Sequence, residues 1–314
     1  MRFRPLGKTG LTASELALGT WGLSGEAYGP VEAADQEKVV RRSLDMGFSL
    51  FETAEAYGGG AMEALLGKTL GRRTDVTVVT KLGIDRSTQP ATKHFDPPYL
   101  CDAAKRSLRR IGRERIDVCL LHNPQPETLV DDGASEALEA MKKEGTIGCW
   151  GVSAGDADVA RAAIQRGAQV IELAYNLFNS VDLHRLAGEL IVAGTGVLAR
   201  STLSYGLLAG LWAKGRSFAE GDQRAERWTK PELERRLEQL DAVRFLVKGE
   251  VLTLRGAAVR YVLANHLVCA AVLGPRSVEQ LEQLVRETGS GPTYLPDADL
   301  AALPRALSRV GIAT

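Results

Sequence analysis

The chain has 314 residues, of which 45% are hydrophobic and 25% are charged, and its formal net charge is zero. This composition is typical of a globular protein that is long enough to bury a full core. The zero net charge leaves no overall basic excess, so nucleic acid and anionic membrane surfaces are not expected partners.

Neither a signal peptide nor a membrane span is expected. The first residues lack a continuous apolar core, and no apolar run approaches the roughly 18 residues that a spanning helix needs. The four cysteines form neither a CxxC pair nor a metal-spaced set, and three of them lie in apolar, strand-like runs. We therefore expect a cytoplasmic protein with reduced thiols and no metal.

Short apolar runs alternate with helical patterns along the chain. Residues 1–15 predict a hairpin that turns at residues 8–10. Strands are expected at 16–19, 49–52, 76–81, 116–122, 147–153, 170–174, 196–200 and 268–273. Helices are expected at 33–46, 63–70, 99–111, 134–144, 156–166, 184–193, 231–248, 253–265 and 277–287, followed by a peripheral helical tail.

This alternation predicts the α/β class, with residues 1–314 forming a single (β/α)8 TIM-barrel domain that carries an N-terminal β-hairpin. The alternative is an open doubly wound sheet, but residues 19–25 match its phosphate-binding fingerprint poorly. Two long loops, at 82–98 and 203–230, are expected to be functional because structureless segments of this length are uncommon inside a compact domain.

Chemistry-bearing residues end neighbouring strands of the predicted barrel. Glu52, Lys81 and His122 end the second, third and fourth strands, and Tyr57 follows the second. A lysine ammonium beside a phenol favours the phenolate and is expected to lower the phenol's pKa, while a carboxylate can hold the lysine. Each residue alone fits a solvated charge, a helix start or a structural histidine. The set together indicates proton donation to a carbonyl.

With these residues in place, the sequence resembles the aldo-keto reductase family over most of its length, from Arg4 to Leu281. The resemblance rests on the motifs Thr53-Ala54-Glu55-Ala56-Tyr57-Gly58, Leu65-Leu66-Gly67-Lys68, Thr80-Lys81, Leu121-His122, Gly151-Val152-Ser153 and Tyr175-Asn176-Leu177. It implies reduction of aldehydes or ketones, or oxidation of alcohols, with NADP(H) on a TIM barrel. It also implies Tyr57 as proton donor, Lys81 and Glu52 as its tuning pair, and His122 as the residue that orients the carbonyl.

The same resemblance implies the ligand contacts. Those on the nicotinamide side are Gly19, Thr20, Trp21, Ser153, Glu172 and Asn176, and those on the adenosine side are Gly274, Arg276, Ser277, Gln280 and Gln283, with Arg276 at the 2′-phosphate. Arg200, Ser201, Leu203 and Gly206, from the seventh strand and its loop, complete the cofactor set. The expected substrate walls are Trp21, Tyr28, Tyr57, His122 and Trp150, whose aromatic rings suit a sugar or a cyclic ketone.

Five positions depart from the family pattern. Glu52 replaces an aspartate, which puts the carboxylate one methylene, about 1.5 Å, farther out and is expected to alter the geometry at Lys81. Glu172 replaces a glutamine that contacts the nicotinamide amide, and a carboxylate cannot donate a hydrogen bond unless it is protonated. Arg200 replaces a stacking tyrosine, and Gln283 and Leu284 replace a glutamate and an asparagine near the adenine.

The main prediction is an NADP(H)-dependent reductase of a small carbonyl compound. Two alternatives stay open: a redox-neutral enzyme or lyase that uses the cofactor differently, and a non-catalytic, NADPH-binding regulatory subunit. The sequence indicates neither the substrate nor the oligomeric state.

Overall fold

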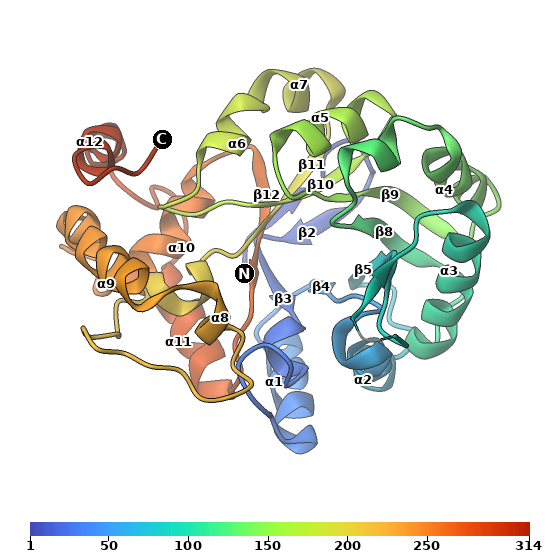
Figure 1. The fold of residues 1–314 in the computed structure, drawn as a ribbon, viewed down its shortest axis with the longest axis horizontal. Coiled ribbons are helices and arrows are strands. Elements are labelled where there is room, and N and C mark those ends of the chain that lie inside the picture. Colours follow the sequence, from blue (N-terminus) through green and yellow to red (C-terminus); the bar gives the residue numbers. More distant parts are fainter. Residues whose placement is uncertain (89) are drawn as a thin grey trace.

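The protein is described by a computed structural model that covers residues 1–88 and 90–314. Within these residues, eight parallel strands close into a barrel in chain order. They are β3 (Leu16–Gly19), β4 (Leu50–Glu52), β5 (Thr77–Leu82), β8 (Ile116–His122), β9 (Ile147–Ser153), β10 (Val170–Ala174), β11 (Gly196–Arg200) and β12 (Val268–Leu273). The predicted (β/α)8 barrel is confirmed, and an open doubly wound sheet is excluded (Figure 1).

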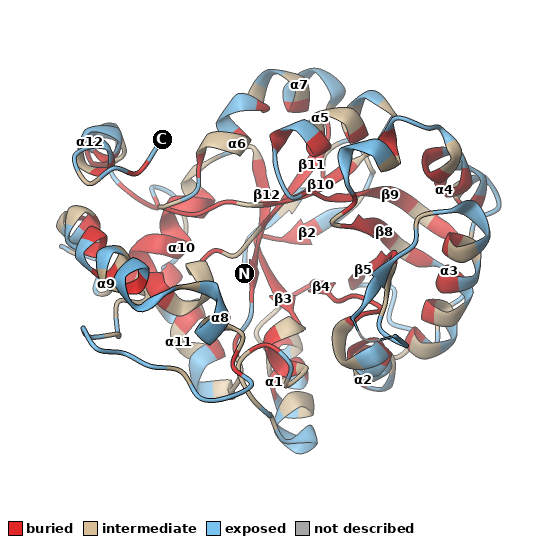
Figure 2. Cartoon of the chain, viewed as in Figure 1, coloured by how far each residue is buried: buried red, intermediate tan, exposed pale blue. Residues whose placement is uncertain are grey.

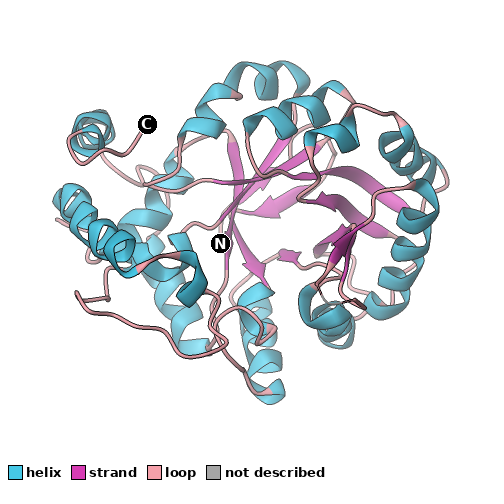
Figure 3. Cartoon of the chain, in the orientation of Figure 1, coloured by secondary structure: helices cyan, strands magenta, loops and turns pink. Residues whose placement is uncertain are grey.

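Helices surround the barrel (Figure 3). They are α1 (Ala33–Asp45), α2 (Ala61–Leu70), α3 (Pro97–Ile111), α4 (Gly133–Lys143), α5 (Ala157–Gln165), α6 (Val181–Arg185), α7 (Ala187–Ala193), α10 (Leu254–Ala264) and α11 (Val278–Thr288). Three more, α8 (Arg224–Arg227), α9 (Lys230–Gln239) and the C-terminal α12 (Asp297–Ser308), lie outside this alternation. No helix within the described residues is long and apolar enough to cross a membrane.

The N-terminal hairpin, β1 (Phe3–Pro5) and β2 (Thr12–Ser14), closes the end of the barrel opposite the strands' carboxyl ends. Its turn passes close to the start of β11, where Lys8 N–H donates to the Gly194 carbonyl at 2.8 Å. Leu6 is fully buried and packs with the residues that fill the barrel interior. The hairpin therefore covers one end of the barrel and leaves the other end for a site.

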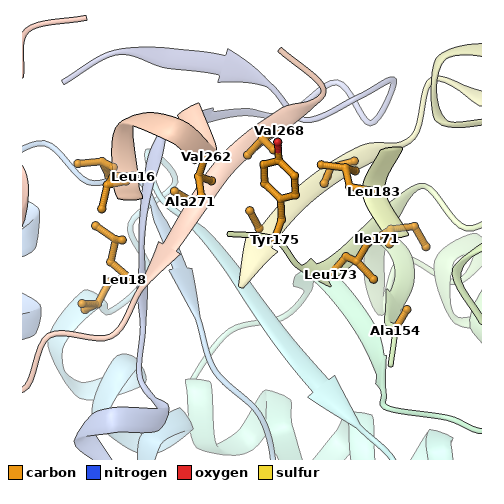
Figure 4. Packing of buried hydrophobic residues seen from close by; sticks show 14 of the residues in the cluster. Leu16, Leu18, Ala154, Ile171, Leu173, Tyr175, Leu183, Val262, Val268 and Ala271 are labelled. Atoms are coloured by element: carbon orange, nitrogen blue, oxygen red, sulfur yellow. The ribbon is translucent and has the colours of Figure 1, made fainter. Parts of the chain in front are cut away.

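Two separate apolar clusters follow the two faces of the strands. The inner cluster fills the barrel with mostly small and branched side chains, including Leu50, Val79, Leu120, Val170 and Leu198. The outer cluster packs between strands and helices, as Figure 4 shows for a part that includes Leu16, Leu18, Ile171 and Leu173. Side chains thus alternate between the faces with a period of two, and the strands are buried on both (Figure 2).

Three segments differ from the predicted elements. The segment 231–248 was expected as one helix, but α9 ends at Gln239 and a 3-10 helix, η5 (Leu240–Leu246), follows. The buried residues of η5, Leu240, Val243 and Leu246, are spaced by three, which fits three residues per turn. The segment 184–193 is split into α6 and α7, and the loop 82–98 contains a short hairpin of β6 (Ile84–Asp85) and β7 (Thr92–Lys93).

Candidate active site

The carboxyl ends of the barrel strands bring the predicted residues together. In seven of the eight barrel strands the last inward-facing residue is polar or a glycine, whereas in β12 it is Val272. The seven residues are Gly19, Glu52, Lys81, His122, Ser153, Glu172 and Arg200. Apart from Lys81, which lies beneath, all of them line one cavity of about 790 Å³. Loops of the barrel's C-terminal face form its walls, as is usual for active sites of this fold.

Tyr57 enters this cavity from the loop after β4. It begins a 3-10 helix, η2 (Tyr57–Gly60), in which Gly58 and Gly59 have φ values of 59° and 58°. This left-handed backbone is favourable for glycine and turns the chain sharply, so that the phenol faces the strand ends. The Tyr57 hydroxyl lies 3.2 Å from Lys81 Nζ and 3.5 Å from Glu52 Oε1, and its ring meets His122 edge-on with centroids 5.7 Å apart.

Lys81 is held by two carboxylates. Its side chain is 1% exposed and forms an ion pair with Glu52. Glu172 Oε2 lies 3.4 Å from the same ammonium, and the Thr53 carbonyl accepts from it at 3.3 Å. A buried ammonium is costly unless it is paired and hydrogen-bonded, so these acceptors stabilise it.

Burial dominates the titration of the site. It lowers the pKa of Lys81 to about 8, and the Glu172 charge opposes this shift. Burial raises the pKa of Tyr57, the Glu172 charge raises it further, and the Arg200 charge lowers it. The expected lowering of the phenol's pKa is therefore wrong for this structure, because burial and the Glu172 charge outweigh the Arg200 charge. Tyr57 keeps its proton at neutral pH.

His122 is neutral at physiological pH. Burial lowers its pKa well below the usual range, and the charges of Lys81 and Arg200 lower it further. Its Nδ1 atom is buried and has no hydrogen-bond partner among the described residues. A neutral imidazole in this position can donate one hydrogen bond and accept another.

The longer side chain of Glu52 is accommodated by a glycine. A Cβ atom at position 19 would lie 2.9 Å from Glu52 Oε2 and 2.8 Å from Val272 Cγ1. Gly19 thus leaves the space into which the extra methylene extends the carboxylate. As a result, Glu52 contacts both Lys81 and Tyr57.

The cavity continues from the barrel centre to the start of α11, where it is lined by Gly274, Arg276, Gln280, Gln283 and Leu284. Arg276 donates to the carbonyls of Gly29 and Pro30 at 2.8 and 2.9 Å, and burial lowers its pKa. No carboxylate pairs with it within the described residues.

The residues along this cavity fit a nicotinamide dinucleotide. Buried polar atoms that lack partners among the described residues occur at both ends, at Arg200 Nε near the centre and at Arg276 Nε beyond it. Such orphaned groups are stabilised when a ligand supplies the missing partner. Gly22 lines the path, and a Cβ atom there would lie 3.2 Å from the Gly274 carbonyl oxygen.

Most of the other residues predicted from the sequence also line the cavity. They are Trp21, Tyr28, Ser201, Leu203 and Gly206. Thr20 is buried beside it, and its hydroxyl has no partner among the described residues. Asn176 lies at an adjoining cavity and donates to the Ser201 carbonyl at 2.9 Å. The Ser277 hydroxyl instead caps α11 by accepting from Gln280 N–H.

The prediction that Trp150 is a substrate wall is wrong. Its side chain is fully buried in the outer cluster, and its indole N–H donates to Glu139 of α4 at 2.6 Å. The period of two along β9 gives the reason. Ser153 and Cys149 face inward, so Trp150 faces the helices.

The predicted loops also contribute residues that the sequence did not single out. Arg86 lines the cavity from 82–98, Arg224 and Arg227 line it from 203–230, and Asn123 lines it from the position after β8. Arg224 pairs with Asp222 at 2.5 Å and lies over the ring of Tyr28. No periodicity marked these positions, because they lie in loops and short helices.

Comparison with known proteins agrees with this geometry. A family model described as the aldo/keto reductase family matches residues 15–292. An aldo-keto reductase of Bacillus subtilis is 28% identical over 298 residues, which are 92% of this chain and 89% of that protein. The L-glyceraldehyde 3-phosphate reductase of Escherichia coli is 26% identical over 306 residues, 91% of this chain and 87% of its own. A solved structure, the glycerol dehydrogenase of Gluconobacter oxydans, aligns with a TM-score of 0.86 at 25% identity, over 99% of this chain and 97% of that one.

These matches define the class of protein as a TIM-barrel oxidoreductase that acts on carbonyl compounds. Because the family model covers most of its length, the chain belongs to the aldo/keto reductase family.

Proposed function

We propose that the chain reduces an aldehyde or a ketone to an alcohol with NADPH, and that Tyr57 donates the proton. The observation that carries this proposal is the Tyr57 hydroxyl, which lies 3.2 Å from the Lys81 ammonium at a cavity of about 790 Å³ that extends as far as Arg276. NADPH, when bound, supplies the hydride. The residues of the chain supply the proton and hold the carbonyl.

In this proposal, Tyr57 gives its proton to the carbonyl oxygen as negative charge develops there. The raised pKa of the phenol keeps the proton available, and the Lys81 ammonium stabilises the phenolate that remains. Neutral His122 donates a hydrogen bond to the same oxygen. Glu52 and Glu172 hold the lysine in position.

Arg276 supports NADP(H) over NAD(H). Its guanidinium carries no carboxylate partner within the described residues and lies at the far end of the cavity, beside Gln280 and Gln283. A guanidinium fork matches a phosphate group well, and the 2′-phosphate is the feature that distinguishes the two cofactors.

The aromatic walls support a substrate with apolar C–H faces, such as a sugar or a cyclic ketone. Trp21 and Tyr28 meet with centroids 5.4 Å apart, and Tyr205 lies edge-on to Trp21 at 6.1 Å. Aromatic faces of this kind pack against sugar rings as well as against carbocycles.

Single-turnover hydride transfer tests the proposal. We expect Tyr57→Phe to slow the oxidation of bound NADPH by aldehydes, ketones and sugars by about 10²–10⁴-fold, while the NADPH dissociation constant changes little. Tyr99→Phe is the matched control, because the Tyr99 hydroxyl donates to Glu55 and does not line the cavity.

Unchanged turnover in Tyr57→Phe would refute Tyr57 as the proton donor. Cofactor binding without hydride transfer to any member of a broad panel would instead favour the regulatory alternative. Product formation without a net change in NADPH would favour the redox-neutral one.

A further inference from the structure

A second cavity opens beside the proposed site. It has a volume of about 470 Å³ and shares part of its lining with the main cavity, namely Asn123, Arg200, Ser201, Tyr205 and Arg227. Asn123 directly follows His122, the predicted carbonyl-orienting residue, and its φ of 49° turns the backbone at this point. One small molecule can therefore reach from the Tyr57 side into the second cavity.

The lining of the second cavity is positively charged. Three arginines line it, Arg200 at the end of β11, Arg227 at the end of α8 and Arg236 on α9, and no aspartate or glutamate does so among the described residues. Asn123, Asn176 and Ser204 add neutral polar side chains. This donor set is selective for an anion.

None of these three arginines forms an ion pair with a carboxylate among the described residues. In the main cavity, Arg86, Arg224 and Arg255 pair with carboxylates at 2.6, 2.5 and 2.5 Å. Arg200 and Arg236, by contrast, donate to the neutral oxygens of Ala154 and Gln239. Arg227 lies over the Tyr205 ring, 3.3 Å from its centroid, and has no ion pair among the described residues.

Stacking on Tyr205 also fixes the plane of the Arg227 guanidinium, so the fork is oriented before a ligand arrives. Three guanidinium groups that have no ion pair among the described residues surround one cavity, and together they create a positive potential that concentrates anions there. A doubly charged group gains more from this arrangement than a single carboxylate does.

We propose that the second cavity binds the phosphate group of a phosphorylated aldehyde or ketone, while the carbonyl of the same molecule faces Tyr57 and His122. This inference rests on the proposed function and names its substrate class. The site is separate from the one expected for the cofactor's 2′-phosphate, because Arg276 lines only the main cavity, at its other end.

Substrate pairs that differ only in the charged group test the proposal. Glyceraldehyde and glyceraldehyde 3-phosphate form one pair, and butanal and succinic semialdehyde supply a carboxylate arm. In the wild type we expect kcat/KM to be highest for the phosphate ester, with inorganic phosphate competing against the aldehyde and not against NADPH. Arg236→Gln changes the one of the three arginines that lines the second cavity but not the main one. It should lower the preference for the ester by about tenfold and leave kcat/KM of glyceraldehyde within about twofold.

Arg235→Gln is the matched control, because Arg235 lies next to Arg236 on α9 but does not line the second cavity. A retained preference in Arg236→Gln, competition of phosphate with NADPH, or a preference for the carboxylate would each overturn the proposal.

Calorimetric binding of inorganic phosphate to the enzyme without cofactor separates this inference from the proposed function. Arginine-dependent binding with no reduction of any carbonyl would refute the function and support the anion site. Reduction of carbonyls without phosphate binding would refute the site alone.

Discussion

At the scale of single residues, the most unusual feature of the site is a lysine held by two glutamates. Glu52 and Glu172 approach Lys81 from β4 and β10, on different sides of the barrel. Arg200 supplies a further positive charge that acts on Lys81, Tyr57 and His122. The second glutamate therefore supports the lysine charge and at the same time holds the proton on Tyr57.

Because of these two roles, we expect Glu172→Gln to change the single-turnover rate in opposite directions below and above the pKa of Lys81. Removing the negative charge lowers the pKa of Lys81 from about 8 and makes the phenolate of Tyr57 easier to form. We expect the single-turnover rate to rise at pH 6–7, where the lysine stays charged. At pH 8 and above it should fall by about three- to tenfold, because the lysine has lost its proton.

Measuring the rate of hydride transfer of the wild type and of Glu172→Gln between pH 6 and pH 9.5 tests whether the variant is faster at low pH and slower at high pH. Glu52→Asp keeps both negative charges and serves as the comparison, because it changes only the reach of one carboxylate. A uniform loss of rate across the pH range in Glu172→Gln would mean that Glu172 is merely structural.

Most catalytic candidates could be predicted from the sequence, because the last inward-facing side chains of neighbouring strands meet at the same end of the barrel. Glu52, Lys81 and His122 could be found in this way. The contact between Glu172 and Lys81 could not, since it spans the barrel between strands that are not neighbours. The direction of the Tyr57 pKa shift was not predicted either, because it depends on burial and on the opposing charges of Glu172 and Arg200.

At the scale of elements, β9 shows how tightly the barrel restricts its residues. Gly151 is paired in register with Val170 of β10, and a Cβ atom at position 151 would overlap the Val170 carbonyl oxygen. A similar approach occurs at Gly148, where a Cβ atom would lie 2.7 Å from the Asp117 carbonyl oxygen of β8. Both contacts are with backbone, which cannot rotate away as a side chain can.

We therefore expect Gly151→Ala to destabilise the protein by about 1–3 kcal/mol or more, or to prevent soluble expression, through strain between β9 and β10. Urea unfolding of the purified variant measures the change. Gly155→Ala, just after the same strand, is the control, because no atom lies within 4 Å of a Cβ added there. Equal stability of both variants would contradict the close approach of the two strands.

Elements were predictable where periodicity was strong and less so elsewhere. The eight barrel strands follow from short apolar runs bounded by polar turns. The division of 231–248 into α9 and η5 does not, since residues spaced by three and by four both read as an apolar helical face. The wrong prediction for Trp150 has a similar origin. An aromatic side chain suggested a pocket wall, whereas the alternation along β9 places this side chain outside the barrel.

At the scale of the whole molecule, the cavities join elements that are distant in sequence. The main cavity is bounded by β-strand ends, by the loops 82–98 and 203–230 and by the start of α11. Because these segments come from both halves of the chain, a dinucleotide in the cavity links them and is bound only by the folded state. Cofactor binding should therefore stabilise the entire fold.

Thermal unfolding measures this linkage and the cofactor preference together. At a concentration about 100 times its dissociation constant, NADPH should stabilise the protein by about 2.7 kcal/mol, which corresponds to a rise in Tm of about 4 °C for a chain of this length. NADH at the same concentration should give a smaller rise, because it lacks the 2′-phosphate that Arg276 is proposed to bind. In Arg276→Gln, the increase in Tm with NADPH should fall to about the increase with NADH.

Arg286→Gln controls for the loss of a positive charge on the same part of the surface, since Arg286 is exposed on α11 and does not line the cavity. It should leave the difference between NADPH and NADH intact. Equal stabilisation of the wild type by both cofactors would remove the role of Arg276 without touching that of Tyr57. The proposed roles of Arg276 and Tyr57 rest on opposite ends of one cavity, so an experiment can refute either role without refuting the other.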